Sequence, residues 1–395
     1  MIINLSSPPS SSINSQISDI FAEVQYSCLK DAIQLLLKCG PHAFMAKTDI
    51  EKAFRLLPIH PDQYNLLVYK WEGAFYYDRC LPMGARSACQ LFEKFSSAIE
   101  FMTKEEGVVY ITHYLDDFFI VNATHSTCQS DLKKFFTVCE DTNTPLVKHK
   151  TLGPSQNLSF VGFEIDTISE TVRLPQDKIN KCKMSIVWLL DRSKSTLKDL
   201  QSLLGLLNFA CTVVVPGRAF LQRLYGLTIG VSKPYFYIRI TQEAKKDLRL
   251  WLTFLESYNG VSLYREELFL STEVVDLFTD AAQSLGCGAI HGNEWFSVAW
   301  PSEWWTRQNI TFLEFIPIYL ALEVWGPSFR NRCLVLHTDN IALMHVINTQ
   351  KSKEPLVMHL AGKLSYNPYH VTFLLKQFIS KEKQILYLTY FLVCR

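Results

Sequence analysis

Residues 114–117, with the sequence YLDD, separate two short apolar segments at 108–113 and 118–121. Both segments are rich in β-branched and aromatic residues, which favour strands, and so short a connection leaves room only for a tight hairpin. The sequence therefore predicts an antiparallel hairpin that presents two adjacent carboxylates, Asp116 and Asp117, at its tip. Asp-Asp at a turn is also ordinary solvated turn chemistry, so the motif alone constrains fold more than function.

A third carboxylate, Asp49, ends a predicted strand at 43–48 and precedes Asp116 by 67 residues. Aspartates at the ends of neighbouring strands can share hard divalent cations, and Mg²⁺ prefers a few carboxylates together with substrate phosphates. Two such ions can activate a 3′-hydroxyl group and stabilise a leaving pyrophosphate. The residues therefore indicate a candidate two-metal site.

The composition is that of a globular chain. Of 395 residues, 48% are hydrophobic and 19% charged, which excludes a disordered chain and predicts two or three domains. No uninterrupted apolar run of about 18 residues and no signal-peptide pattern occur, so we expect neither a membrane span nor secretion. The 11 cysteines form no C-x-x-C pair and are typical of reduced thiols. We therefore expect an intracellular protein of the cytoplasm or nucleus.

Positive charge is concentrated in the middle of the chain. Residues 171–250 contain 14 Lys and Arg against 5 Asp and Glu, whereas the whole chain has a net charge of +1. Residues 176–258 have helical spacing with a break at Pro216-Gly217. A basic helical region can follow a polyanion such as nucleic acid, and a solvated helix face explains the same pattern equally well.

A second set of carboxylates lies in the last third of the chain. Asp280 ends a predicted strand near 274–279, Glu314 lies 34 residues further on in a predicted helix at 311–325, and Asp339 follows 25 residues later after a predicted strand. The order of elements predicts a mixed sheet with covering helices. Carboxylates placed in this way can converge on two metals and hydrolyse a phosphodiester with metal-bound water.

These motifs resemble those of retroelement reverse transcriptases, in particular the long-terminal-repeat and DIRS-like groups. TDIEKAFRLLPIHP, LPMGARSACQLFE, HYLDDF and LSFVGFEID follow in the family's order up to about residue 175, and TDAA, LEFIPIYLAL and HTDN resemble the attached ribonuclease H domain. The resemblance implies an α+β fold with a reverse transcriptase palm and partial fingers, a helical thumb or connection, and an α/β ribonuclease H-like domain. The expected segments are 1–20 as a disordered or loop remnant of the fingers, 21–175 as fingers and palm, 176–265 as thumb or connection, and 272–395 as the ribonuclease H-like domain with an atypical C-terminus.

The resemblance also implies roles in the polymerase site. Asp49 and Asp116 would hold two Mg²⁺ ions, Asp117 would support them, and Lys150 would donate a proton to pyrophosphate. Phe54 would lie beneath the sugar and reject ribonucleotides, unless it is ordinary core, and Lys150 is equally compatible with a solvated loop. The loop residues expected to pack against the incoming nucleotide are Met83 and Gly84.

Further roles follow for the remaining segments. The residues expected to contact nucleic acid are Tyr114, Lys178, Lys181, Lys183, Arg218 and Arg223. In a functional nuclease site, Asp280, Glu314 and Asp339 would hold two more Mg²⁺ ions. The implied function is RNA-directed DNA synthesis from deoxynucleoside triphosphates on an RNA or DNA primer–template, with an RNA–DNA hybrid as the nuclease substrate.

Two departures from the family pattern concern the ends of the chain. No Lys or Arg precedes Lys30, where the family has a basic fingers hairpin, and no Asp follows Asp339, where the family has a fourth carboxylate. We therefore expect a chain shortened at both ends, with an incomplete nuclease site. Two other functions stay open, a nucleic-acid-binding remnant without catalysis and an interaction protein with neither property. The sequence indicates no oligomeric state.

Overall fold

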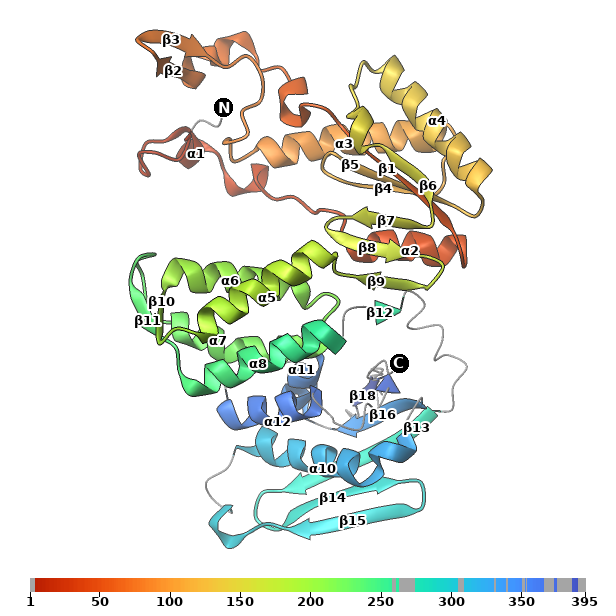
Figure 1. Cartoon of the computed structure of the whole chain (residues 1–395), viewed down its shortest axis with the longest axis vertical. Coiled ribbons are helices and arrows are strands. Elements are labelled where there is room, and N and C mark those ends of the chain that lie inside the picture. The colour runs from red at the N-terminus through yellow and green to blue at the C-terminus, as the bar shows by residue number, and fades with distance from the viewer. Residues whose placement is uncertain are drawn as a thin grey trace. The chain divides into compact units, whose positions relative to one another are not determined.

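The computed structural model describes residues 4–257, 261–262, 274–304, 309–329, 332–338, 340–349, 352, 354–365, 373–374 and 386–389. The chain forms two compact units, Met1–Val172 and Arg173–Arg395. Both units mix helices and sheets, which confirms the α+β class (Figure 1). The boundary between the expected segments 176–265 and 272–395 and the site residue Asp339 lie outside the described residues, and the division into four segments stays a prediction.

The first unit is built on a four-stranded sheet of order β4-β5-β1-β6 (Figure 1). Its strands are β1 (Phe44–Asp49), β4 (Ile111–Tyr114), β5 (Asp117–Asn122) and β6 (Leu152–Ser155). The helices of this unit are α1 (Ile13–Gln16), α2 (Leu29–Cys39), α3 (Ala88–Glu105) and α4 (His125–Asp141). Short 3₁₀ helices lie at Asp19–Phe21, Ala53–Leu56, Pro61–Leu67 and Lys148–Lys150.

The alternation of side chains along these strands shows which residues lie on each face of the sheet. Ala46 pairs with Ile120 across β1 and β5, and both are buried in a core that includes Phe92 of α3 and Phe135 of α4. Since successive side chains of a strand point to opposite faces, Asp49 lies on the other face from Ala46. Helices α3 and α4 therefore cover one face, and the side chain of Asp49 lies on the opposite one.

Smaller strands complete the first unit. β2 (Val68–Trp71) and β3 (Ala74–Tyr77) form an exposed hairpin, and β7 (Asn157–Phe160), β8 (Phe163–Asp166) and β9 (Thr171–Arg173) belong to a second sheet. The N-terminal segment, expected as a disordered or loop remnant of the fingers over residues 1–20, contains turns and loops together with α1. Leu5 is buried, α1 forms, and the Asn14 side chain bonds to a distant loop, so residues 4–20 are packed onto the unit.

The second unit begins with a helical region. Its elements are α5 (Gln176–Leu190), α6 (Leu197–Ala210), a 3₁₀ helix at Val215–Leu221, α7 (Gln222–Thr228) and α8 (Gln242–Ser257). The sequence did not predict the antiparallel pair β10 (Lys194–Thr196) and β11 (Tyr237–Arg239). These strands have three residues each and lie about 40 residues apart, too short for a periodic signal. A further short strand, β12, is Val261–Ser262.

A mixed sheet of order β15-β14-β13-β16-β17 follows, with β18 paired to β16. Its strands are β13 (Val274–Ala282), β14 (Gly286–His291), β15 (Glu294–Ala299), β16 (Arg332–Thr338), β17 (Phe373–Leu374) and β18 (Leu386–Thr389). The helices are α10 (Ile310–Trp325), α11 (Ile341–Thr349) and α12 (Pro355–Ser365), with 3₁₀ helices at Ser302–Trp304 and Gly326–Phe329. β13 and β16 are parallel, whereas β13, β14 and β15 form an antiparallel meander.

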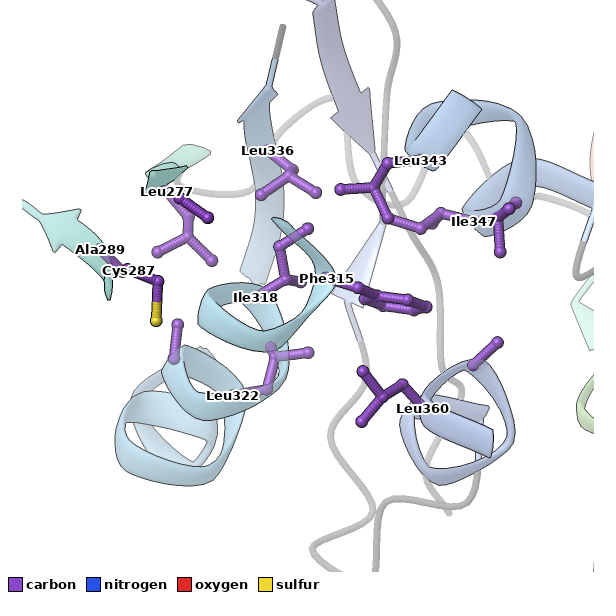
Figure 2. Packing of buried hydrophobic residues seen from close by; sticks show 14 of the residues in the cluster. Leu277, Cys287, Ala289, Phe315, Ile318, Leu322, Leu336, Leu343, Ile347 and Leu360 are labelled. Atoms are coloured by element: carbon purple, nitrogen blue, oxygen red, sulfur yellow. The ribbon is translucent and has the colours of Figure 1, made fainter. Parts of the chain in front are cut away.

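Helix α10 is the centre of this unit's core. Phe315, Ile318 and Leu322 pack against Leu277 of β13 and Leu336 of β16 (Figure 2). The stretch Ile310–Phe329 is long and apolar enough to cross a membrane by length and composition, and half of it is buried inside the unit. Such partial burial is typical of a core helix, and the absence of a membrane span stays a prediction.

Candidate active site

The candidate site is formed where β1 meets the β4–β5 hairpin. Asp49 lies directly opposite Asp117 in the antiparallel register of β1 and β5. Asp116 belongs to the two-residue connection between the paired residues Tyr114 and Asp117, and its carbonyl accepts a hydrogen bond from the Ile50 N–H at 3.0 Å. The fold thus brings together the three carboxylates that the sequence placed 67 residues apart.

The turn that carries Asp116 has an unusual backbone. Leu115 has a φ of +52°, in the left-handed region that costs a residue with a Cβ about 1–2 kcal/mol. On α3, Glu93 and Glu100 flank His113 of the preceding strand β4, with carboxylate oxygens 3.2 Å from its Nε2 and 2.5 Å from its Nδ1. Sequence reasoning missed Glu93, although an acidic residue beside the buried Phe92 on the core-facing side of a helix is a usable signal.

A cation already faces Asp49. The Nζ of Lys150 donates a hydrogen bond to Oδ2 of Asp49 at 2.6 Å, and this bond raises the pKa of Lys150. The carbonyl of Asp49 accepts a second bond from the Val147 N–H at 2.8 Å, which fixes the segment leading to Lys150. The sequence prediction of a lysine at this site is therefore matched in position, while its role as proton donor stays a prediction.

Electrostatics favour a cation at this place. Burial raises the pKa of Asp116, and the negative charge of Asp49 raises it further. Burial likewise raises the pKa of Asp117, with Lys47 opposing and Asp49 and Asp116 adding to the shift. Three carboxylates that repel one another in a half-buried site are stabilised by a positive charge placed among them.

The donor set suits a hard divalent cation. All three groups offer carboxylate oxygens, the ligands that Mg²⁺ prefers. Within the described part of the chain, no three His, Cys, Asp or Glu side chains are arranged as a ready cage for a metal ion. Since Lys150 holds one oxygen of Asp49, a metal would compete with this ammonium group for its ligand.

Comparison with known proteins shows what the first part of the chain is similar to. Residues 4–165, which include all the residues above, match the family model "Reverse transcriptase (RNA-dependent DNA polymerase)". These residues are similar to reverse transcriptases of the retroelement type. The resemblance of the first motifs to reverse transcriptases is therefore confirmed, whereas the resemblance of the later motifs to a ribonuclease H domain stays a prediction.

Polyproteins of foamy viruses are among its relatives. The Pro-Pol polyprotein of feline foamy virus is 24% identical over 191 residues, which are 47% of this chain and 15% of that protein. The Pro-Pol polyprotein of simian foamy virus type 1 is 25% identical over 226 residues, 57% of this chain and 18% of that protein. The aligned part is thus less than a fifth of the length of these relatives.

A solved structure supports the same fold. The foamy viral protease-reverse transcriptase "dRH", solved in complex with double-stranded DNA, has a TM-score of 0.56 and 18% identity to this chain. The match covers 93% of this chain and 61% of that one. At this level of identity the likeness concerns the fold alone.

The residues predicted to contact the nucleotide are Phe54, Met83 and Gly84, which lie between Asp49 and Asp116 in the sequence. The ring of Phe54 is half-buried and lies 5.1 Å from that of Phe92, so it joins the core on one side. Met83 is exposed, and the carbonyl of Gly84 accepts a hydrogen bond from Asn14 Nδ2 at 2.9 Å. Asn14, which sequence reasoning missed, therefore ties the N-terminal segment to the loop of Met83 and Gly84.

The residues predicted to bind nucleic acid differ in their availability. Tyr114 is 38% exposed beside Tyr26, and Lys181 is exposed on α5. Lys178 lies over the ring of Phe209, at 5.8 Å from its centroid. Each of these side chains can reach solvent, and their role in binding stays a prediction.

Three further members of this set are in the second unit. Lys183 lies 3.5 Å from Glu256, and Arg218 is half-buried in the 3₁₀ helix before α7. Arg223 donates a hydrogen bond at 2.9 Å to the buried carboxylate of Asp247. Arg223 therefore also pairs with a buried carboxylate, and its contact with phosphate stays a prediction.

The second carboxylate set is described in part. Asp280 is exposed within β13, opposite Gly288 of β14, and lines, with Phe278 and Trp295, a cavity of about 650 Å³. Glu314 lies in α10, which packs against β13, and Asp339 is outside the described residues. The strand and the helix that carry Asp280 and Glu314 are therefore in contact, and their joint role in a nuclease site stays a prediction.

Proposed function

We propose that this chain is an RNA-directed DNA polymerase that extends a primer on an RNA or DNA template from deoxynucleoside triphosphates. The observation that carries the proposal is the register of Asp49 opposite Asp117, with Asp116 in the two-residue connection of the same hairpin. The match of residues 4–165 to the reverse transcriptase family supports it.

The side chains have distinct tasks in this proposal. Asp49 and Asp116 would hold two Mg²⁺ ions, with Asp117 in support, and the ions would activate the primer 3′-hydroxyl group and neutralise the leaving pyrophosphate. Lys150 would keep a proton on Nζ for the pyrophosphate, since its bond to Asp49 favours the charged ammonium form. Phe54 would lie beneath the sugar, and Met83 and Gly84 would border the nucleotide.

The second unit would serve the same substrate. Lys178, Lys181, Lys183, Arg218 and Arg223 would contact the phosphates of the primer–template, which positions the duplex without reading its sequence. Asp280, Glu314 and Asp339 would form a ribonuclease H-like site for the RNA–DNA hybrid, without the family's fourth carboxylate. Such a protein would act inside the cell, in the cytoplasm or nucleus.

Primer extension tests the proposal. The purified chain, Mg²⁺ and deoxynucleotides are combined with a DNA primer on an RNA template, beside Asp116→Asn and the control Asp62→Asn. Asp62 is fully exposed in a 3₁₀ helix away from the carboxylates, so its variant should keep activity. We expect extension by the unaltered chain and by Asp62→Asn, and a loss of at least about 100-fold in Asp116→Asn.

The same samples separate the alternatives. Fluorescence anisotropy measures binding of an RNA–DNA hybrid at several salt concentrations. No extension with intact, salt-sensitive binding would favour a remnant that binds without catalysis. Absence of both extension and binding would favour an interaction protein.

A further inference from the structure

One amide side chain of the N-terminal segment holds the loop that contains Met83 and Gly84. The Nδ2 atom of Asn14 donates a hydrogen bond to the Gly84 carbonyl at 2.9 Å, and its Oδ1 atom accepts one from the Arg86 N–H at 2.8 Å. Nδ2 also donates to the hydroxyl group of Ser6 at 2.8 Å. The amide therefore pairs with a donor and an acceptor of the loop backbone at the same time.

We infer that Asn14 is a positioning residue that holds the loop of Met83 and Gly84 in the shape that binds the incoming deoxynucleoside triphosphate. The inference rests on the proposed function, in which these two loop residues border the nucleotide. Asn14 acts on the nucleotide through the loop backbone and not on the reacting groups.

The first argument is that the segment carrying Asn14 is itself anchored. Leu5 is buried, and its carbonyl accepts a hydrogen bond from the Asn14 N–H at 3.0 Å. Further along the segment, the Arg86 guanidinium donates to the Ile17 carbonyl at 3.2 Å and forms an ion pair with Asp19. Because the segment is attached on both sides of Asn14, the amide can hold the loop backbone in place.

The second argument is that packing between the segment and the loop is incomplete. A cavity of about 440 Å³ is lined by Ile13 and Ile17 of the segment and by Leu81, Pro82 and Ala85 at the loop. Atoms beside a cavity lack packing partners on that side, so apolar contacts fix their position less firmly. The hydrogen bonds of Asn14 supply directional contacts at a place where packing is incomplete.

Two variants of Asn14 remove these bonds to different extents. Asn14→Ala removes both bonds to the loop, while Asn14→Asp keeps an acceptor for the Arg86 N–H and places a second oxygen against the Gly84 carbonyl. Asn4→Asp is the matched control, because it makes the same change in the same segment. Asn4 is exposed, and its Oδ1 atom accepts a local bond from the Ser6 N–H that an aspartate keeps. Thermal melts followed by circular dichroism check that all three variants fold.

The first readout needs neither nucleotide nor activity. Amide hydrogen exchange of the chain alone, resolved at Arg86, should be at least about 10-fold faster in Asn14→Ala than in the unaltered chain. Asn14→Asp should fall between these two, and Asn4→Asp should leave the exchange of Arg86 unchanged. Equal exchange in Asn14→Ala and the unaltered chain would overturn the inference, whatever the polymerase assay gives.

The second readout asks whether the loop serves the nucleotide. Isothermal titration measures binding of the complementary deoxynucleotide, with Mg²⁺, to the chain on a primer–template whose primer ends in a dideoxynucleotide. The affinity should fall about 5- to 10-fold in both Asn14 variants, the effect of about one hydrogen bond, and less than about 2-fold in Asn4→Asp. The affinity for the primer–template itself, measured by fluorescence anisotropy, should stay unchanged in all three variants.

Primer extension separates positioning from a loss of folded protein. In the Asn14 variants, KM for deoxynucleotide should rise with kcat little changed, whereas a smaller folded fraction would lower kcat and leave KM unchanged. Faster exchange at Arg86 with unaltered nucleotide affinity would limit Asn14 to a structural role and overturn the inference. If the unaltered chain binds the deoxynucleotide without extending a primer, only the proposed function fails, and nucleotide binding by the variants still decides the inference. If it neither binds the deoxynucleotide nor extends a primer, both fail.

Discussion

Lys150 and Asp49 form an ion pair whose partners differ sharply in exposure. Their Nζ and Oδ2 atoms are 2.6 Å apart, yet the Lys150 side chain is 53% exposed and that of Asp49 only 8%. The ammonium group therefore approaches a nearly buried carboxylate from the solvent side. A metal ion that enters from solvent to bind Asp49 must therefore displace the ammonium group of Lys150.

Replacing the lysine should therefore affect metal binding and catalysis in opposite directions. In Lys150→Met we expect Mn²⁺ to bind about 2- to 5-fold more tightly, since solvent screening limits an exposed charge to less than about 1 kcal/mol. Extension should fall, because the proton on Nζ is gone. Isothermal titration and primer extension measure the two effects. Lys148→Met, in the same short helix, is the control, and weaker Mn²⁺ binding in Lys150→Met would contradict the competition.

The carboxylates of the site should make the metal-free protein less stable as pH rises. The ordinary pKa of Asp is 3.8, and burial and then Asp49 raise that of Asp116 in the folded state. The folded state thus binds this proton more tightly than the unfolded state, and the free energy of unfolding falls as pH rises through the folded pKa. Asp116→Asn should reduce this slope and add about 0.5–2 kcal/mol at neutral pH.

Urea unfolding with EDTA at pH 5 and pH 7 measures this effect. Added Mg²⁺ should stabilise the unaltered chain and leave Asp116→Asn nearly unchanged, because a ligand that binds only the folded state stabilises it. The exposed Asp62→Asn should behave like the unaltered chain. A variant Asp116→Asn that is less stable than the unaltered chain at pH 7 would refute the prediction.

A second pH effect should arise in the helical region. Burial, with Glu243 adding and Arg223 opposing, raises the pKa of Asp247 from 3.8 to about 6. The free energy of unfolding should therefore fall between about pH 4 and pH 6, and Asp247→Asn should remove that fall. Arg223→Met should cost about 1–3 kcal/mol at pH 8, where the carboxylate is charged, and less at pH 5. Urea unfolding tests both variants, with Lys181→Met as control. An equal loss of stability in Arg223→Met at pH 5 and pH 8 would contradict an ion pair between Arg223 and Asp247.

Gly153 should tolerate no side chain. It has a φ of +99°, and a Cβ placed there would lie 2.3 Å from the carbonyl oxygen of Met45 in the strand that carries Asp49. Gly40 has nearly the same backbone, with a φ of +103°, and nothing within 4 Å of such a Cβ. We expect Gly40→Ala to cost about 1 kcal/mol and Gly153→Ala about 3 kcal/mol or more. Chemical denaturation measures the free energy of unfolding of both variants. Equal losses would show that the contact with the Met45 carbonyl does not contribute.

Much of the site could be predicted from local sequence. The predicted strands at 43–48 and around YLDD correspond to β1, β4 and β5 within three residues at each end, because their apolar runs are bounded by turns. Apolar residues at helical spacing likewise predict helices at 87–102 and 126–141, which correspond to α3 and α4. These signals depend only on neighbours along the chain.

Contacts between distant segments could not be predicted in this way. The hydrogen bond from Asn14 to the Gly84 carbonyl joins residues 70 positions apart, and neither residue belongs to a periodic sequence pattern. The network of His113, Glu93 and Glu100 depends on which side of α3 faces β4, which only the packed core decides. The packing of the Ser- and Pro-rich N-terminal segment could not be predicted for the same reason, since Asn14 bonds to partners far along the chain.

The two-residue connection between Tyr114 and Asp117 sets a rule for insertions and deletions. One residue more or less in β5 would shift its pairing with β1 and turn Asp117 toward α3 and α4, because side chains alternate between faces. A length change in β4 or in the connection would instead shift the pairing of β4 with β5 and displace Asp116. The exposed β2–β3 hairpin has no such restriction, and its turn can lengthen into solvent. Insertions and deletions among natural variants of this chain should therefore occur at the β2–β3 hairpin. The strands that carry the carboxylates should differ only by substitutions.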